Sequence, residues 1–181
     1  AYRTGALPED TCSGDIALLY KKGDARDPRN YRPITLLQTD HKILARVLAN
    51  RLKKTIHTII SKEQVGFVPR RMIGEATHLL KLVQAYLDDT DGEGLALAID
   101  WEKAFDRVSW DYYHKAICAL GFGPGYSRWL TLLTNKDSLP TRWIKANGRR
   151  SNPFSIHCGM PQGCPLSPLA FLLVAEGLTH V

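Results

Sequence analysis

Thr141-Arg142-Trp143-Ile144-Lys145-Ala146, followed directly by Asn147-Gly148, is the stretch from which the fold is predicted. An Asn-Gly pair between two strand-like runs favours the tight turn of a β-hairpin, and the chain returns through Phe154 and Ile156. The segment therefore predicts two antiparallel strands, so the fold contains a sheet.

Two further apolar runs predict strands of the same sheet. Residues 16–20 are short and apolar, and they stop at the charged turn 21–24, after which a polar, proline-interrupted loop is expected up to Pro33. Residues 95–99 are apolar on both faces, which is typical of a strand in the middle of a covered sheet. That strand is predicted to end at Asp100.

Helices are predicted where apolar residues recur at helical spacing. The longest covers residues 40–60, and shorter ones are expected around 76–87, 109–120, 129–133 and 169–178. Ser109 is placed to cap one of them and Gly121 to end it, while Ser167-Pro168 supplies a cap and a first-turn proline for the last. Helices mixed with hairpin strands around one sheet predict an α+β fold.

Positive charge is concentrated in the first part of the chain. The protein carries 24 basic and 18 acidic side chains, and residues 1–72 hold 14 of the basic ones but only 7 of the acidic ones. On the long helix, Lys42, Arg46, Lys53 and His57 fall within one narrow sector. This face is predicted to contact nucleic acid or phosphate; a merely solvated helix face is the alternative.

The composition of the 181 residues excludes several classes of protein. With 44% hydrophobic and 23% charged residues, the chain is neither disordered nor fibrous. No uncharged apolar run approaches the roughly 18 to 20 residues of a membrane span, and the N-terminus lacks a signal peptide's apolar segment. A soluble, unsecreted protein with no membrane partner is expected. The four cysteines contain no Cys-x-x-Cys pair and are predicted to be reduced and buried: Cys12, Cys118, Cys158 and Cys164.

Asp100 is the first candidate for chemistry. A carboxylate at the carboxyl end of a central strand would be presented rigidly to a cleft, and Mg²⁺ prefers one or two carboxylates together with substrate phosphates. Spacing alone favours another interpretation, in which the carboxylate hydrogen-bonds the backbone of the next turn.

Four segments together resemble a known family. Residues 98–108, Ala98-Ile99-Asp100-Trp101-Glu102-Lys103-Ala104-Phe105-Asp106-Arg107-Val108, resemble the first palm motif of reverse transcriptases of LINE-type, non-LTR retrotransposons. Residues 24–37 resemble the fingers motif, Gln64-Val65-Gly66-Phe67 the next short block, and residues 159–168 the second palm motif. The matches follow the family's order and extend from about residue 16 to the last residue.

The resemblance implies a right-hand polymerase arrangement, with fingers in residues 1–92 and a partial palm in residues 93–181. Asp100, helped by the backbone carbonyl of Trp101, would bind the catalytic Mg²⁺, for which Mn²⁺ can substitute. Phe105 would crowd the sugar 2′-position and so favour deoxynucleotides; a core phenylalanine is the alternative.

The resemblance also implies contacts to the nucleotide and to nucleic acid. Gln162 would touch the incoming nucleotide, and Gly159 and Gly163 would let the backbone approach the base pair closely. The guanidinium of Arg32, and with it Lys42, would neutralise the triphosphate. Four further cations are candidates for template backbone contacts: Lys21, Lys22, Arg46 and Lys53. For Lys21 and Lys22, contact with water only is the alternative.

Two acidic features near these motifs are predicted to take no part in catalysis. Asp106 is interpreted as a turn cap, because it and Asp100 cannot both point along one strand end. Tyr86-Leu87-Asp88-Asp89 has the spelling of the family's later aspartate motif. Because it precedes Asp100 and ends an amphipathic helix, it is predicted to be a solvated helix terminus.

The implied function is that of an RNA-directed DNA polymerase, which adds deoxynucleotides to a primer 3′-hydroxyl by two-metal phosphoryl transfer. Its partners would be an RNA template, a DNA primer and deoxynucleoside triphosphates, and its location the nucleus. The chain is expected to be a fragment that stops before the third palm motif and thumb, and to be inactive alone. A non-catalytic RNA-binding relic is the main alternative. A metal-dependent nuclease fits less well, because the acidic cluster at residues 88–93 lies in a turn.

Overall fold

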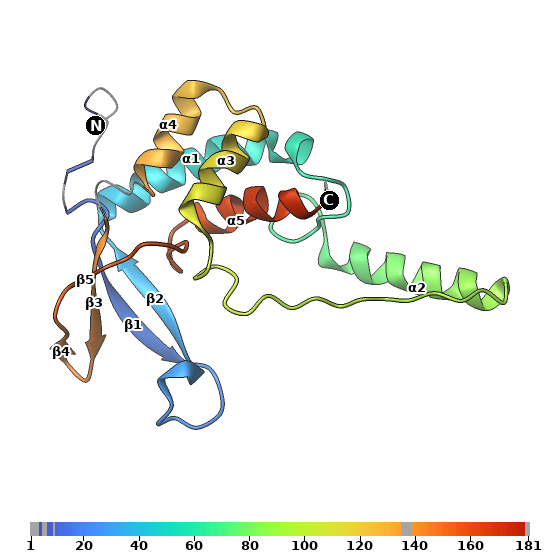
Figure 1. Ribbon diagram of the computed structural model, residues 1–181, viewed down its shortest axis with the longest axis horizontal. Coiled ribbons are helices and arrows are strands. Elements are labelled where there is room, and N and C mark those ends of the chain that lie inside the picture. The colour runs from blue at the N-terminus through green and yellow to red at the C-terminus, as the bar shows by residue number, and fades with distance from the viewer. Residues whose placement is uncertain (1–3, 5–6, 9, 135–138, 180–181) are drawn as a thin grey trace.

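The computed structural model describes residues 4, 7–8, 10–134 and 139–179. They form one mixed sheet and a group of helices beside it (Figure 1), which confirms the predicted α+β class. The strands lie in the order β2-β1-β3-β4, with β5 also paired to β3. The strands are β1 (Gly14–Tyr20), β2 (Tyr31–Leu37), β3 (Thr141–Ala146), β4 (Arg149–Arg150) and β5 (Phe154–Ser155).

The β1–β2 hairpin includes a strand that the sequence did not predict. Residues 31–33 were expected in a loop, but β2 begins at Tyr31 and pairs antiparallel with β1 from Gly14↔Leu37 to Tyr20↔Tyr31. The prediction of a loop followed from Pro33, because proline is rare inside strands. Proline is tolerated in β2 because β2 is an edge strand. Proline has no N–H to donate, and on the open side of an edge strand no neighbouring strand needs that donor.

The hairpin predicted from residues 141–156 is confirmed. Strand β3 lies parallel to β1, with Asp15 opposite Trp143, and antiparallel to β4 and β5. Asn147 and Gly148 both take positive φ angles, 51° and 71°, as a tight turn of the mirror-image type requires. The sheet is therefore built from two hairpins that are joined side by side through β1 and β3.

The five predicted helices are all present: α1 (Thr39–Ile59), α2 (Ile73–Asp89), α3 (Trp110–Ala119), α4 (Pro124–Leu132) and α5 (Ser167–Ala175), with short 3₁₀ turns at Pro28–Asn30 and Glu176–Leu178. The Ser109 hydroxyl accepts from the backbone N–H of Tyr112 and caps α3 as expected. At α5 the cap lies one residue earlier, at Leu166, and the Ser167 hydroxyl donates instead to the carbonyl of Pro161.

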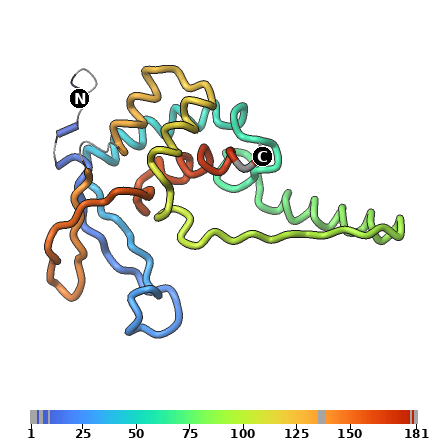
Figure 2. The backbone as a smooth tube through the Cα atoms, viewed as in Figure 1, coloured from blue at the N-terminus to red at the C-terminus, as the bar shows by residue number. Residues whose placement is uncertain are grey.

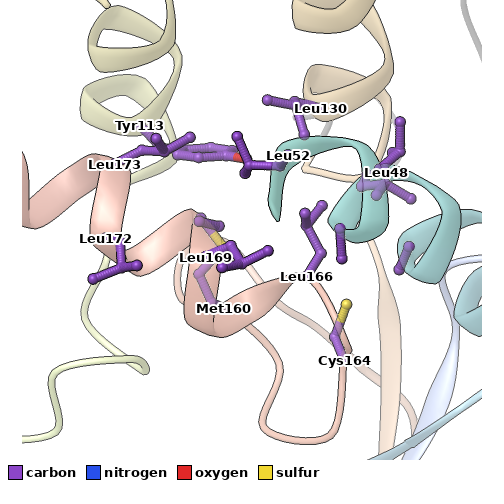
Figure 3. Close-up of a cluster of buried hydrophobic side chains, with 14 of the residues drawn as sticks. Leu48, Leu52, Tyr113, Leu130, Met160, Cys164, Leu166, Leu169, Leu172 and Leu173 are labelled. Carbon is purple, nitrogen blue, oxygen red and sulfur yellow. The ribbon is translucent and has the colours of Figure 1, made fainter. Parts of the chain in front are cut away.

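Helices α1, α3, α4 and α5 enclose the core (Figure 3). Leu48 and Leu52 of α1 meet Tyr113 of α3, Leu130 of α4 and Leu173 of α5, all almost completely buried. The predicted apolar stripe of α1 was partly wrong, because Ile43 and Val47 are exposed. The buried face runs through His41, Ala45, Leu48, Ala49, Leu52 and Ile56 instead.

Helix α2 and the segment after it project from this body as an arm, residues 73–100 (Figures 1 and 2). No residue of α2 is buried. The predicted strand at residues 95–99 is wrong: these residues form no strand, and Leu95 is 96% exposed. A strand apolar on both faces needs neighbouring strands and covering layers, and the described sheet supplies neither at this place.

The four cysteines are free thiols, but their burial differs from the prediction. Cys12 and Cys164 are buried as expected, whereas Cys118 and Cys158 are exposed. Within the part of the chain that the structure describes, no helix has both the length and the apolar character that crossing a membrane requires.

Candidate functional site

A cavity of about 650 Å³ opens where three segments meet: the β1–β2 hairpin, the turn at residues 101–106 and the loop at residues 161–168. The segments are far apart in sequence. Several residues singled out from the sequence line this one cavity: Lys21, Arg32, Trp101, Phe105, Gln162 and Gly163. The fold thus brings parts of three separate motifs to one concave surface.

Backbone hydrogen bonds join the loop to the turn. The N–H of Gly159 donates to the carbonyl of Val108, and the N–H of Met160 donates to that of Phe105, both at 2.8 Å. A Cβ on Gly159 would lie 2.7 Å from the Asp106 carbonyl oxygen, and its φ is 88°. Only glycine fits such a close approach without strain, so this residue fixes how the two motifs pack.

A second glycine joins the same loop to the sheet. The N–H of Thr35 in β2 donates to the carbonyl of Gln162 at 2.6 Å. Gly163 has a φ of 118°, and a Cβ there would lie 2.6 Å from the Thr35 carbonyl oxygen. The close approach predicted for Gly159 and Gly163 is therefore made, in this structure, to Asp106 and Thr35 of the protein itself.

Asp106 has a different role from the one predicted. Its carboxylate oxygens accept from the side-chain amide of Gln162 at 3.1 and 3.3 Å. The turn is closed instead by the backbone, through the N–H of Asp106 and the carbonyl of Lys103 at 2.9 Å. The interpretation of Asp106 as a turn cap is thus wrong, because its side chain reaches across the cavity wall to the second motif.

Phe105 forms an aromatic part of the cavity lining. The ring is half-buried and packs at 4.8 Å between ring centroids against Phe171 of α5. It also meets Phe67 edge-on, at 6.3 Å. Phe105 therefore packs against the core, as one alternative expected, and also lines the cavity.

The charged residues of the described lining are mostly basic. The lining holds the cations Lys21, Arg29, Arg32 and Lys103 beside the single carboxylate of Asp106. Arg29 and Lys103 are not among the predicted site residues; their position inside two of the motifs, beside predicted residues, was the available signal. Arg29 is also held by an exposed ion pair with Asp27 at 2.8 Å, and hydrogen bonds from Arg29 lower the pKa of that carboxyl. An excess of cations in a concave site favours an anionic ligand.

Other predicted residues lie outside the described lining of this cavity. Asp100 is exposed and belongs to no strand, so the rigid presentation predicted for it is not observed. Lys22 is exposed on the hairpin. Lys42, Arg46 and Lys53 are exposed on α1, where they keep the predicted basic face.

The described side chains that could bind a metal ion do not cluster in this structure. Across residues 4, 7–8, 10–134 and 139–179, no three His, Cys, Asp or Glu side chains gather closely enough to hold an ion. The Asp100 carboxylate and the Trp101 carbonyl are oxygen donors of the kind that Mg²⁺ prefers, but they are fewer than it needs. The described residues alone therefore do not make up a metal site.

A buried polar cluster lies next to the glycine loop. His41 of α1 places its Nε2 3.6 Å from the sulfur of Cys164. The buried guanidinium of Arg142 donates to the carbonyls of Cys12 and Thr141. Burial, with a smaller contribution from the Arg142 charge, lowers the pKa of His41 to about 4. His41 is thus neutral at physiological pH.

Comparison with known proteins identifies the family. The family model described as reverse transcriptase (RNA-dependent DNA polymerase) matches residues 20–180. An uncharacterized 149 kDa protein of transposon TX1 from Xenopus laevis is 34% identical over 97% of this chain and 13% of its own length. The probable RNA-directed DNA polymerase from transposon BS of Drosophila melanogaster is 30% identical over 97% of this chain and 19% of its own length.

A further relative is the retrovirus-related Pol polyprotein from the type-1 retrotransposable element R2 of Popillia japonica. It is 30% identical over 96% of this chain and 24% of its own length. The chain therefore spans about a quarter or less of these relatives. Its ordered motifs and the match over residues 20–180 agree: the chain belongs to the reverse transcriptase (RNA-dependent DNA polymerase) family.

Proposed function

We propose that this chain forms the nucleotide-binding part of an RNA-directed DNA polymerase, which adds deoxynucleotides to the 3′-hydroxyl of a primer on an RNA template. One observation carries the proposal: residues from three separate family motifs line a single cavity of about 650 Å³, whose charged residues are mostly basic. A volume of this size lies within the range of small-molecule sites. The excess of cations suits a triphosphate.

The lining residues suggest how a nucleotide would be bound. Arg32 would neutralise the triphosphate by paired hydrogen bonds. Lys21, expected on the template backbone, lines the cavity and would take the triphosphate role expected of Lys42, which lies outside the described lining. Gln162 would contact the nucleotide with a side chain that Asp106 already orients. Phe105 would occupy the space that a ribose 2′-hydroxyl needs, so the site would prefer deoxyribose.

Residues outside the cavity would bind the metal ion and the template, and Trp101 of its lining would help to bind the metal ion. Asp100 and the Trp101 carbonyl would supply part of the ligand set for Mg²⁺ or Mn²⁺, which neutralises phosphate charge when bound. The exposed basic face of α1, with Lys42, Arg46 and Lys53, would follow the template backbone. Residues 1–92 would correspond to fingers and residues 93–181 to part of a palm.

Nucleotide binding by the 181-residue chain tests the proposal. Isothermal titration with dTTP in Mg²⁺ should give saturable binding, and Arg32→Ala or Gln162→Ala should weaken it several-fold. Arg149→Ala is the matched control, because Arg149 is exposed on β4 and outside the described lining of the cavity. Absence of dTTP binding, or equal loss in the control, would contradict the proposal.

An RNA-binding relic is the second candidate. It is favoured by one observation: the basic face of α1 is exposed, whereas Asp100 is exposed and lies in no strand. Retained RNA binding without any dTTP binding would support the relic over the polymerase. A nuclease gains no support, because the acids at residues 88–93 lie on the exposed arm.

A further inference from the structure

Phe67 has an unusual backbone for its exposure. Its side chain is 62% exposed, yet its φ is 59°, in the left-handed region that favours glycine. Gly66, the neighbouring residue that would adopt this conformation without strain, does not take it. An exposed aromatic residue held in a strained conformation must be fixed by its surroundings.

The loop that carries Phe67 is fixed at several points. Val68 is buried in the core. The Arg71 guanidinium donates to the carbonyls of Ser61 and Gln64 at 2.5 and 2.6 Å. The buried carboxylate of Glu176 accepts from the N–H and the hydroxyl of Ser61, both at 3.1 Å. These bonds hold both ends of the loop against α1 and the segment after α5.

The ring of Phe67 contacts Phe105, a residue of the cavity lining. Its edge meets the Phe105 ring at 6.3 Å and an interplanar angle of 86°, a favourable edge-to-face geometry. Phe105 lines the cavity, whereas Phe67 is absent from the described lining. Phe171 contacts the same Phe105 ring at 4.8 Å. Phe105 is thus positioned by two rings, one from α5 and one from the fixed loop.

We propose that Phe67 is a positioning residue that sets the place of the Phe105 ring and thereby the selectivity between deoxyribose and ribose. The selectivity part of this inference rests on the proposed function. The positioning part rests on the contact between the two rings and does not depend on nucleotide binding. The strained backbone directs the Phe67 ring toward Phe105, while the next residue, Val68, points into the core.

Phe67→Gly provides a sharp test, since glycine relieves the strain at this φ and removes the ring. The variant should keep or raise the melting temperature while losing the contact. Arg70→Gly is the matched control, because Arg70 is an exposed residue of the same loop with a φ of 69°. Phe67→Tyr should behave like the wild type, since it retains a ring.

Two measurements are made on each variant. The first is the ¹⁹F NMR shift of 4-fluorophenylalanine placed at position 105, without nucleotide. The second is the ratio of affinities for dTTP and UTP in Mg²⁺. In Phe67→Gly, the fluorine signal should shift or broaden and the ratio should fall about 2- to 10-fold, the effect of losing one aromatic pair. Neither should change in Arg70→Gly.

Each outcome separates the two proposals. An unchanged fluorine signal in Phe67→Gly overturns the positioning role, whatever the nucleotides do. A shifted signal with an unchanged affinity ratio overturns the selectivity role. If the wild type binds neither nucleotide, the proposed function and the selectivity role fail together, while the fluorine signal still decides whether Phe67 positions Phe105.

Discussion

The side-chain amide of Gln162 donates to both carboxylate oxygens of Asp106, and the two residues are 56 positions apart in the chain. This contact crosses from the first palm-like motif to the second. It lies beside the backbone bonds that Gly159 and Met160 make to the same turn. Side chains and backbone therefore hold the two motifs in one fixed relation at the wall of the cavity.

Asp106→Ala should lower dTTP affinity without unfolding the chain. The Gln162 amide would lose its acceptor and gain rotamer freedom, and hydrogen bonds to charged groups contribute about 1.5–3 kcal/mol when buried, less in a half-buried site such as this. Urea unfolding should show a loss of about 1 kcal/mol, and titration should show several-fold weaker binding. Glu102→Gln breaks only an exposed ion pair with Arg107 in the same segment, which contributes little, so it should leave both nearly unchanged. Equal affinity in wild type and Asp106→Ala would show that the contact does not orient Gln162.

Gly163→Ala should destabilise the fold strongly. The new methyl group would overlap the Thr35 carbonyl oxygen at 2.6 Å, and the φ of 118° is closed to alanine. A strained conformation of this kind costs about 1–3 kcal/mol, and displacement of β2 adds to it. Gly74→Ala is the control, because a Cβ there meets no atom within 4 Å in an exposed helix. The control should be neutral or stabilising by up to about 1 kcal/mol in urea unfolding. A neutral Gly163→Ala would argue against the close approach.

Acid should weaken the fold through His41. Burial lowers its pKa in the folded state to about 4 from an ordinary value of 6.5, so the unfolded chain takes up the proton first as pH falls. The contribution of neutral His41 to the free energy of unfolding is fully present above pH 6.5. It is lost as the pH falls toward 4, by roughly 3 kcal/mol in total. His41→Gln should remove this part of the pH dependence. The measurement is the free energy of unfolding at a series of pH values for both proteins; parallel curves would contradict the assignment.

The basic face of α1 should contribute to RNA affinity through phosphate contacts. Each contact adds about 0.7 to the slope of log affinity against log salt for a single strand. The pair of changes Lys42→Ala and Arg46→Ala should thus lower the slope by about 1.4. Lys115→Ala, at an exposed residue of α3, is the control. Fluorescence anisotropy with a labelled RNA at several salt concentrations gives the slope, and an unchanged slope excludes this face.

The arm should exchange its amide hydrogens faster than the core. Residues 95–99 make no strand, and α2 buries none of its residues, whereas α5 has Leu172 and Leu173 almost fully buried. Hydrogen exchange by mass spectrometry should show no protection at residues 92–101 and strong protection in α5. Protection at residues 95–99 equal to that in α5 would mean that these residues are paired after all.

Local patterns predicted much of the fold correctly. Asn147-Gly148 gave the hairpin because its residues suit a turn with two positive φ angles, and helical spacing gave all five helices. The motif resemblance selected residues that the fold brings to one cavity, although it could not show the pairing of Asp106 with Gln162. That contact depends on how two distant loops dock, which no local pattern encodes.

The failures have physical causes. Pro33 concealed β2, because proline is excluded from central strands but not from an edge strand. Residues 95–99 have the composition of a buried strand, but burial depends on neighbours that composition does not specify. Asp100 follows them, so it does not stand at the end of a strand as predicted, for the same reason.

The arm also bears on how the protein behaves at high concentration. An extended, proline-free run of alternating leucine, alanine and isoleucine leaves its amide and carbonyl groups open to strands from other molecules. Such runs seed intermolecular β-sheets when nothing shields them. Preparations of the chain should therefore precipitate more readily as they are concentrated, and a lysine in place of Leu97 should slow that precipitation while leaving the helical core untouched.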